Sequence, residues 1–263
     1  MSGVMERTLT ILERLAQDVR GVPLTTLADE LHIPRSAVHR LLLELADNGY
    51  VRQSRERGDY MLTTKLVSLG LNYLKSSGLV DLCQPILDRL AESCGELVRL
   101  GVVDVDHLTW VSLSQGARAG LRYDPDQGID AKLSCTASGH AWLSTLEEDE
   151  ALMLVGKQGF GKPSDYGPNA PTSPTALLKA LRQARKLGYA MAVETYVRGL
   201  AAISAPIVRN GKGTVGVLSI SGPVVRLTED KMRAFAPELL ASAAVIAGAS
   251  GASPLFDRAY SSG

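Results

Sequence analysis

The segment from Leu24 to Leu45, LTTLADELHIPRSAVHRLLLEL, constrains the fold more than any other part of the chain. Its apolar and small residues are spaced as in two short helices that cross steeply and share one small core. Pro34 stands where a second helix would begin. Such a second helix turns hydrogen-bond donors toward a DNA groove. We therefore predict a helix-turn-helix whose DNA-contacting residues are Thr25, Arg35, Ser36, Ala37, His39 and Arg40.

The residues that flank this segment predict a winged form of the motif. Asn48-Gly49 supplies a helix stop, and two strand-like runs at 50–53 and 60–62 enclose a polar turn. That pattern is typical of a β-hairpin, and its arginines Arg52, Arg55 and Arg57 are expected to contact phosphates or a minor groove. Amphipathic patterns at 8–19 and 64–75 predict a first helix and a linker helix.

The net charge of the N-terminal part is a weak indicator of DNA binding. Residues 1–60 hold eight arginines and no lysine against nine aspartates and glutamates. Five of these arginines lie between Arg35 and Arg57, so the positive charge is concentrated after the turn. We expect modest affinity from one module and hence a homo-oligomer, because two linked modules bind more tightly than one.

Several other classes of protein lack support in the sequence. The three cysteines form no CxxC pair, which favours a reduced cytoplasmic protein over a disulfide framework. The four histidines show no HxxxH or HExxH spacing, so we predict no metal site and no cofactor. No apolar run approaches the roughly 20 residues of a membrane span. Residues 1–18 carry charges within their apolar pattern, unlike a signal peptide.

The remaining chain, from about residue 79 to 251, predicts a second domain of a different kind. Strand-like runs are bracketed by helical ones, which favours an α+β fold with an antiparallel sheet and helices packed over it. The expected domains are 1–62, a linker helix at 63–78, 79–251, and a tail at 252–263. The expected helices are 80–94, 137–145, 148–155, 174–187 and 229–247, and the expected strands are 96–103, 108–113, 121–123, 203–208 and 214–221.

Three patterns suggest chemistry but have simpler explanations. Residues 211–216 match GxGxxG, yet a strand rather than a helix follows, so we predict a hairpin instead of a dinucleotide loop. Cys135 and His140 have no orienting carboxylate nearby, which favours a packed cysteine over a nucleophile. Asp104, Asp106 and His107 are typical of a polar turn more than of a metal site. We expect no enzymatic activity.

The chain resembles the IclR family of bacterial transcriptional regulators over nearly its whole length. Four segments carry the resemblance: LTTLADELHIPRSAVHRLLLELADNGYV, LSCTASGHA, LGYAMAVETYVRGLAAISAPI and VGVLSISGPVVRLT. The resemblance implies a winged helix-turn-helix, a linker helix and a GAF-like effector domain. It also implies dimers, or dimers of dimers, on double-stranded operator DNA, and a small organic effector.

The resemblance also implies where the effector binds. Family members often have two carboxylates and a thiol at the positions of Ala192, Thr195 and Ala202. This chain therefore lacks those polar contacts to an effector. The remaining hydroxyl groups suit a carboxylate or carbonyl oxygen, and we predict a small organic acid or semialdehyde. Tyr123 and Met191 could add apolar walls. The implied effector residues are Leu133, Ser134, Cys135, Thr136, Ala137, Ser138, Gly139, Trp142, Ala192, Glu194, Ala202, Ser219 and Ser221.

Alternatives stay open at this stage. Glu194 could instead pair with an arginine, and Ser219 and Ser221 could face solvent from one strand face. The favoured function is a repressor of a catabolic operon that its effector releases from DNA. An effector-dependent activator is the alternative. A helix-turn-helix protein acting only through protein contacts, or an enzyme with an appended DNA domain, has less support.

Overall fold

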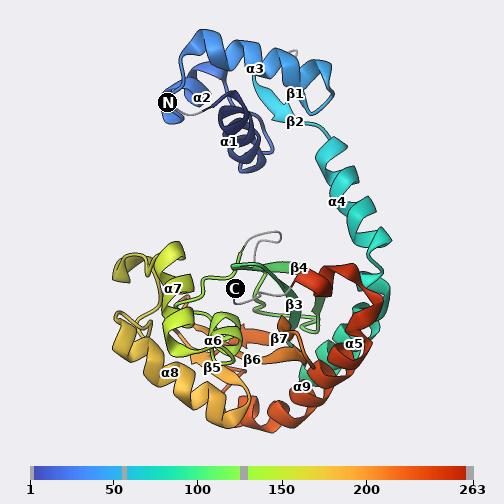
Figure 1. Ribbon diagram of the computed structural model, residues 1–263, viewed down its shortest axis with the longest axis vertical. Helices are drawn as coiled ribbons and strands as arrows, with labels where there is room; N and C mark the ends of the chain where they lie inside the picture. The colour runs from blue at the N-terminus through green and yellow to red at the C-terminus, as the bar shows by residue number, and fades with distance from the viewer. Residues whose placement is uncertain (1–2, 55–57, 125–129, 259–263) are drawn as a thin grey trace. The chain divides into compact units, whose positions relative to one another are not determined.

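The computed structural model describes residues 3–54, 58–124 and 130–258, and the chain divides into two compact units, Met1–Ser76 and Ser77–Gly263 (Figure 1). The boundary between the units lies within the segment predicted as the linker, 63–78. The elements of the N-terminal unit are α1 (Val4–Ala16), α2 (Leu24–Glu30), α3 (Arg35–Asp47), β1 (Val51–Gln53), β2 (Tyr60–Leu62) and α4 (Lys65–Ser76).

The N-terminal unit is a winged helix-turn-helix built on one small core. Leu15 of α1, Leu27 of α2 and Leu41 of α3 are all buried in the same cluster. β1 and β2 pair antiparallel, and Val22 bridges to Tyr60 and so ties the hairpin to the segment before α2. α1 begins at Val4, earlier than the predicted residue 8. The predicted helix-turn-helix and hairpin are confirmed.

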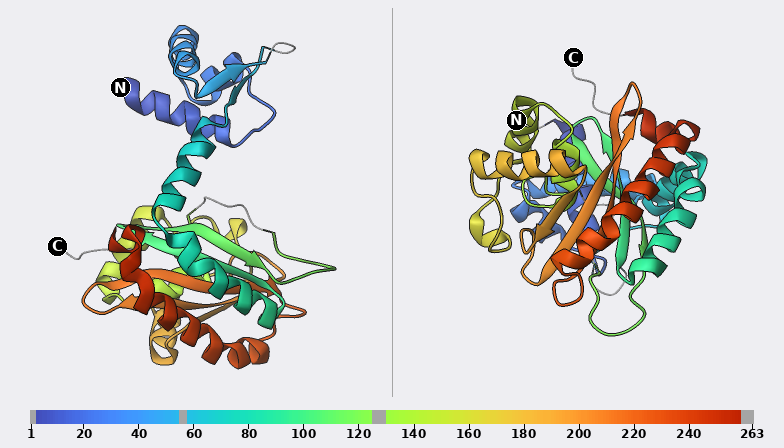
Figure 2. Two further views of the ribbon diagram at one scale, coloured as in Figure 1. Left: turned by 90° about the vertical axis from the view of Figure 1, so that its right-hand side faces the viewer. Right: turned by 90° about the horizontal axis from the view of Figure 1, so that it is seen from below.

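The C-terminal unit is a five-stranded antiparallel sheet between two layers of helices (Figure 2). α5 and α9 pack on one face, while α6 and α8 pack on the other. The strand order is β4-β3-β7-β6-β5. This architecture confirms the predicted α+β fold. Its elements are α5 (Leu79–Cys94), β3 (Leu97–Asp104), β4 (His107–Gln115), α6 (Ala137–Leu143), α7 (Glu148–Gln158), α8 (Pro174–Leu187), β5 (Ala190–Val193), β6 (Leu200–Arg209), β7 (Gly213–Pro223) and α9 (Glu229–Ala249), with 3-10 turns at Pro163–Asp165, Ser250–Ala252 and Pro254–Arg258.

The strand register places one row of residues on the face that α6 covers. Arg99 of β3 is opposite Ser219 of β7, and Ser219 is in turn opposite Ser204 of β6. Side chains of residues in register point to the same face of a sheet. Ser138 of α6 identifies that face, because its hydroxyl lies 3.0 Å from the hydroxyl of Ser204.

Two strand predictions differ from the structure. Residues 121–123 were expected to form a strand, but they form a bend, and the carbonyl of Leu121 accepts a hydrogen bond from the Arg226 guanidinium. β5 was not predicted, because it is a short edge strand whose alanines carry little strand signal. The GxGxxG segment joins β6 to β7 as a hairpin, as predicted.

The expectation that no apolar run approaches the length of a membrane span is wrong for the segment that contains α9. Residues Glu229–Ala252 meet the length and hydropathy of such a span. α9 packs along β6 and β7 of the sheet, and its buried residues recur at helical spacing. Part of the apolar composition therefore serves the core, and 28% of the apolar window is buried within the chain. These buried residues are Met232, Ala236, Leu239, Ala243 and Ile246.

The packing of α6 predicts opposite effects for two glycine substitutions. A Cβ added at Gly139 would lie 2.5 Å from the Cα of Leu133, so either α6 or its neighbour must move. Gly139→Ala is expected to lower the free energy of unfolding by about 1–3 kcal/mol. Gly156→Ala in α7 is the matched control. Nothing lies within 4 Å of a Cβ there, and stability should rise by about 0.5–1 kcal/mol.

Urea denaturation followed by tryptophan fluorescence measures both changes. The chain has two tryptophans, Trp110 and Trp142, and both lie in the C-terminal unit, so the signal reports that unit alone. Wild-type stability in Gly139→Ala would show that α6 does not approach Leu133 as closely as described.

Candidate DNA-binding surface and effector cavity

α3 presents a polar face opposite its buried one. Val38, Leu41, Leu42 and Leu45 fill the core, which leaves the other side of the helix to solvent. Arg40 is exposed and makes no ion pair or hydrogen bond with the described residues, while Arg35 lies 3.7 Å from Asp29. Most of the predicted contact residues are therefore accessible to solvent. Thr25, Arg35, Ser36, His39 and Arg40 are exposed, and Ala37 is half-buried.

The wing adds one further arginine to the described surface. Arg52 of β1 is exposed and opposite Met61 of β2. Arg55 and Arg57, which were also predicted to contact DNA, lie outside the described residues. Unpaired guanidinium groups on a helix and on an adjacent hairpin are suited to hold phosphates and base edges.

A small cavity lies where the row of sheet residues meets the N-terminal end of α6. It is a space of about 20 Å³, with room for about one water molecule. Its floor is formed by Ser219 and Ser221 of β7 and Ala202 of β6, and Thr136, Ala137 and Ser138 contribute from the α6 side. The other lining residues are Arg99, Ala192, Thr195, Tyr196, Leu200 and Ala201.

A second hollow of about 250 Å³ shares three lining residues with the first. Arg99, Thr136 and Tyr196 line both, so the two spaces are neighbours. We call them the inner and the outer cavity. The outer cavity is also lined by Trp110, Tyr123, Asp124, Asp130, Ala131, Lys132 and Val197.

The hydroxyl groups of the inner cavity are already engaged with one another. Ser219 and Ser221 lie 3.2 Å apart between their oxygens, and Ser138 pairs with Ser204. Thr136 donates to the carbonyl of Lys132 and accepts from the backbone N–H of Gly139. In each serine pair one hydroxyl donates to the other, which leaves one O–H per pair to donate elsewhere.

The family of the chain follows from comparison with known proteins. Residues 71–247 match the model of the bacterial transcriptional regulator IclR C-terminal domain, and residues 4–55 match the IclR helix-turn-helix domain. The chain belongs to the IclR family of bacterial transcriptional regulators.

Similarity to individual members extends over most of the chain. The transcriptional repressor IclR of Escherichia coli is 30% identical over 240 residues, which cover 91% of this chain and 86% of the relative. The acetate operon repressor of Salmonella typhimurium is 31% identical over 229 residues, with coverage of 87% and 82%. Because both the helix-turn-helix model and the C-terminal model of this regulator family match, the chain is a DNA-binding transcriptional regulator.

Solved structures support the same fold. An IclR transcriptional regulator from Alicyclobacillus acidocaldarius superimposes with a TM-score of 0.81 at 20% identity, covering 95% of this chain and all of that one. An IclR homolog complexed with 4-hydroxybenzoate, from Microbacterium hydrocarbonoxydans, superimposes with a TM-score of 0.76 at 20% identity and the same coverage.

Only part of the effector set that the IclR resemblance implied lines the inner cavity. Seven positions do so, and all of them come from the α6 end, β5, β6 or β7. These seven are Thr136, Ala137, Ser138, Ala192, Ala202, Ser219 and Ser221. The alternative that Ser219 and Ser221 face solvent is wrong, because both are buried.

The structure places the other implied residues elsewhere. Trp142 is fully buried in the core cluster with Leu133, and Gly139 packs against the backbone of Leu133. Glu194 has a left-handed backbone, and its carboxylate accepts a hydrogen bond from the N–H of Gly199, which closes the turn after β5. The carboxylate of Glu194 therefore stabilises this turn. Ser134 and Cys135 are buried, and neither lines the inner or the outer cavity, while Met191 lies against a separate hollow beside α8.

The sequence patterns did not predict that Arg99, Thr195 and Tyr196 line the inner cavity. The signal for Arg99 was a single charge in the otherwise apolar run LVRLGVV of β3. Thr195 is held at the cavity by a 2.6 Å hydrogen bond from its hydroxyl to the carbonyl of Cys135. No pattern in the sequence indicated that this link joins the turn after β5 to the segment before α6.

Cys135 and His140 do not form a catalytic pair. Burial raises the pKa of the Cys135 thiol to about 11, so it remains neutral at physiological pH. The His140 ring lies in the core, and its Nε2 is 2.9 Å from the carbonyl of Ser134. Asp106 lies in the turn between β3 and β4 and pairs with Lys157 at 3.2 Å.

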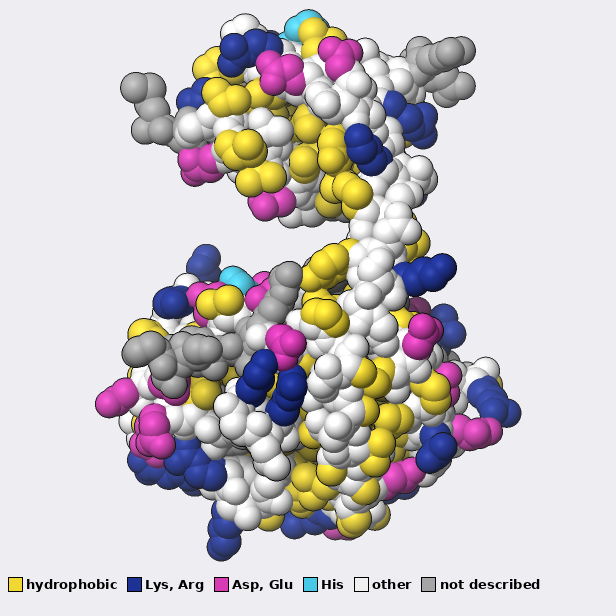
Figure 3. All heavy atoms as spheres, turned by 45° about the vertical axis from the view of Figure 1, so that its right-hand side comes forward, with side chains coloured by type: hydrophobic (Ala, Val, Ile, Leu, Met, Phe, Trp, Pro, Cys, Tyr) yellow, Lys and Arg dark blue, Asp and Glu magenta, His cyan; other side chains and the backbone are white. Residues whose placement is uncertain are grey.

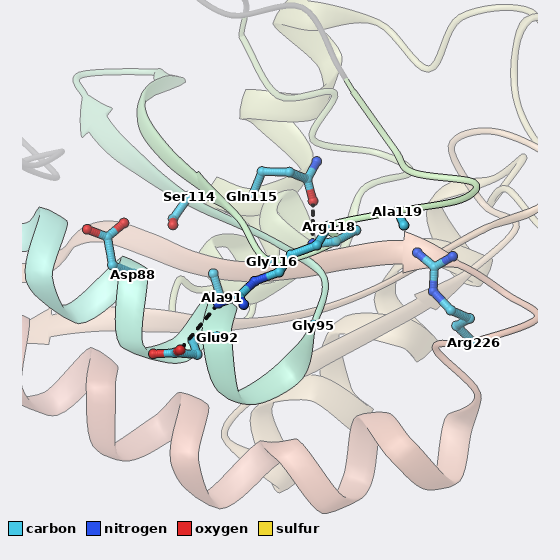
Figure 4. A pocket seen from close by; sticks show the side chains of 11 residues that line it. Asp88, Ala91, Glu92, Gly95, Ser114, Gln115, Gly116, Arg118, Ala119 and Arg226 are labelled. Carbon is cyan, nitrogen blue, oxygen red and sulfur yellow. Dashed lines mark hydrogen bonds and ion pairs between the residues drawn. The ribbon is translucent and has the colours of Figure 1, made fainter.

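A larger hollow outside α5, of about 630 Å³, is an open groove whose charges are already satisfied (Figure 4). Glu92 pairs with Arg118 across it. Arg226, at its end, forms a two-bond contact with the buried carboxylate of Glu96. This groove therefore offers a ligand fewer unpaired charged groups than the two cavities near Arg99.

The burial of His140 predicts a loss of stability in acid. Burial lowers its pKa below the ordinary value of 6.5, so the folded chain holds a neutral ring. As the pH falls through about 6.5, the unfolded chain takes up a proton before the folded chain does. The free energy of unfolding therefore falls with pH, and His140→Gln should remove up to about one proton from that dependence. Urea titrations at neutral and acidic pH measure it, and parallel curves for both proteins would contradict the assignment.

Proposed function

We propose that this IclR-family regulator is a repressor that binds double-stranded operator DNA through α3 and the wing. A small organic acid or semialdehyde in the inner and outer cavities releases it. The observation that carries the proposal is the coexistence of unpaired arginines on α3 and β1 with a small hydroxyl-floored cavity in the other unit. We expect the protein to act in the cytoplasm.

The relatives support both parts of this proposal. The two relatives described above are repressors by name, and so is the AllR repressor of Escherichia coli, which is 27% identical over 227 residues. The IclR homolog from Microbacterium hydrocarbonoxydans was solved with 4-hydroxybenzoate, an organic acid. These precedents favour repression over activation and an acidic effector over a neutral one.

We further propose that the N-terminal unit dimerises through α4 and the outer side of α1. α4 has no residue buried by the described part of the chain, although half of its residues are apolar. Figure 3 shows hydrophobic side chains gathered on the surface of the N-terminal unit. A second copy would cover such a surface, and two DNA-binding modules would offset the weak net charge of one. The exposed apolar residues are Val4, Met5, Leu9, Val67, Leu69, Leu71 and Tyr73. A dimer of dimers would require a further contact.

The different roles proposed for α3 and the wing predict two kinds of loss in DNA affinity. Arg40→Ala is expected to cost about 1–3 kcal/mol of binding to the specific operator, because the guanidinium reads base edges. Arg52→Ala should weaken binding to operator and unrelated DNA alike and reduce the salt slope by about one. Fluorescence anisotropy over a series of salt concentrations measures both.

A control and a contrary outcome complete this experiment. Arg118→Ala, on the surface of the other unit, should leave DNA binding unchanged. Equal effects of Arg40→Ala and Arg52→Ala on all sequences would contradict the division of roles. Binding without salt dependence would favour a helix-turn-helix that makes only protein contacts.

The proposed dimer surface predicts the effect of charge on α4. Val67→Asp combined with Leu71→Asp should shift the protein toward monomer and weaken operator binding, because both side chains are exposed and one helical turn apart. Sedimentation velocity measures the mass. Val225→Asp, an exposed valine of the other unit, should leave the mass unchanged. An unchanged mass in the α4 double variant would place the interface elsewhere.

A further inference from the structure

Arg99 is a charged residue that the fold itself does not explain. It lies in β3, opposite Leu113 of β4 and Ser219 of β7, where the flanking residues Val98 and Leu100 are apolar and buried. Its guanidinium carbon lies 3.8 Å from the ring centre of Trp110 and 5.7 Å from that of Tyr123. The guanidinium therefore stacks on an aromatic face, which leaves its edge directed elsewhere.

The edge of this guanidinium has no anion among the described residues. Its Nε is buried and makes no hydrogen bond, and no described carboxylate forms an ion pair with it. Burial lowers the pKa of Arg99, yet an arginine keeps its proton at any physiological pH. Arg99 as a whole is half-buried, and an unpaired charge that is partly removed from water costs stability, so this position favours an anion that arrives from outside.

We propose that Arg99 anchors the carboxylate of the effector. This inference rests on the proposed function, because it takes the two cavities to be the effector site. Arg99 lines both cavities, so an anion bound at its edge lies at their junction. The planar fork of a guanidinium matches a carboxylate through two parallel hydrogen bonds, which neutral carbonyl compounds do not form.

The sizes of the two cavities indicate where the rest of the ligand lies. The inner cavity has room for about one water molecule, so beyond the carboxylate it takes at most one small polar group beside Ser219 and Ser221. The outer cavity, at about 250 Å³, takes the body of the ligand against the rings of Tyr123 and Tyr196. The ligand class is therefore a compact monocarboxylate that is bound by its acid end.

Lys132 is the competing cation of the outer cavity. It is half-buried and lines the outer cavity but not the inner one. An ammonium group is a strongly hydrated point charge that stays partly screened by solvent at such a position. Arg99 is the better anchor because it is stacked, more deeply placed and common to both cavities. Lys132→Gln is thus the matched control, since it removes the same charge from the same hollow.

The test compares each acid with its own amide in the full-length protein. The probes are butyrate with butyramide and benzoate with benzamide, measured by isothermal titration and by the fluorescence of Trp110, which lines the outer cavity. At least one carboxylate should bind the wild type, and its amide should bind at least about 10-fold more weakly. Arg99→Gln should reduce carboxylate binding about 10- to 100-fold and leave amide binding unchanged. Lys132→Gln should change carboxylate binding by less than about 3-fold.

The melting temperature without ligand separates an anchor from a structural arginine. Because Arg99 has no anion among the described residues, Arg99→Gln should melt at the wild-type temperature or above it. If Arg99 were only structural, Arg99→Gln would lower the melting temperature, and acids and amides would bind equally well. Amides that bind as tightly as acids, no binding by either carboxylate, or a larger loss in Lys132→Gln than in Arg99→Gln would overturn the inference.

Operator binding distinguishes failure of this inference from failure of the proposed function. Arg99→Gln should bind operator DNA with wild-type affinity, but a carboxylate that releases the wild type should no longer release the variant. If the wild type binds operator DNA and an uncharged ligand releases the protein from it, the result supports the repressor function and contradicts the proposed role of Arg99. If the wild type does not bind operator DNA, the proposed function itself fails.

Discussion

The packing of α6 against the sheet and against Leu133 is the constraint on which the inner cavity depends. Gly139 lets the helix approach the backbone of Leu133, and Ser138 reaches Ser204 on β6. Trp142 is buried in the core cluster, while the inner cavity lies near Thr136, where the helix begins. The register of β3, β7 and β6 then decides which side chains face that space: Arg99 and the serines rather than their apolar neighbours.

Much of this architecture follows from local sequence patterns. The helix-turn-helix was predictable because the apolar spacing between Leu24 and Leu45 fits two crossed helices, and α8 was predicted with its bounds of Pro174 and Leu187. The strand pair β6 and β7 followed from Asn210-Gly211 between two β-branched runs. These signals are strong because each is carried by residues adjacent in the chain.

The cavity was less predictable because contacts between distant segments define it. Glu194 was assigned to the effector site by its place in a motif, but its left-handed backbone and its bond to Gly199 use the carboxylate in a turn. Arg99 was missed because its role depends on Trp110 stacking from the neighbouring strand and on serines more than a hundred residues later. Sequence periodicity shows that a strand is buried, but it does not show which buried position faces a space.

The central claim is that occupancy of the cavity in one unit changes the affinity of the other unit for DNA. Such a coupling is reciprocal, because a ligand that weakens DNA binding by some factor is itself bound more weakly by the DNA complex by the same factor. The most direct test measures the operator Kd with and without a saturating carboxylate, and the carboxylate Kd with and without operator. The account predicts two equal factors, both greater than one. An operator Kd unchanged at saturating carboxylate would contradict it.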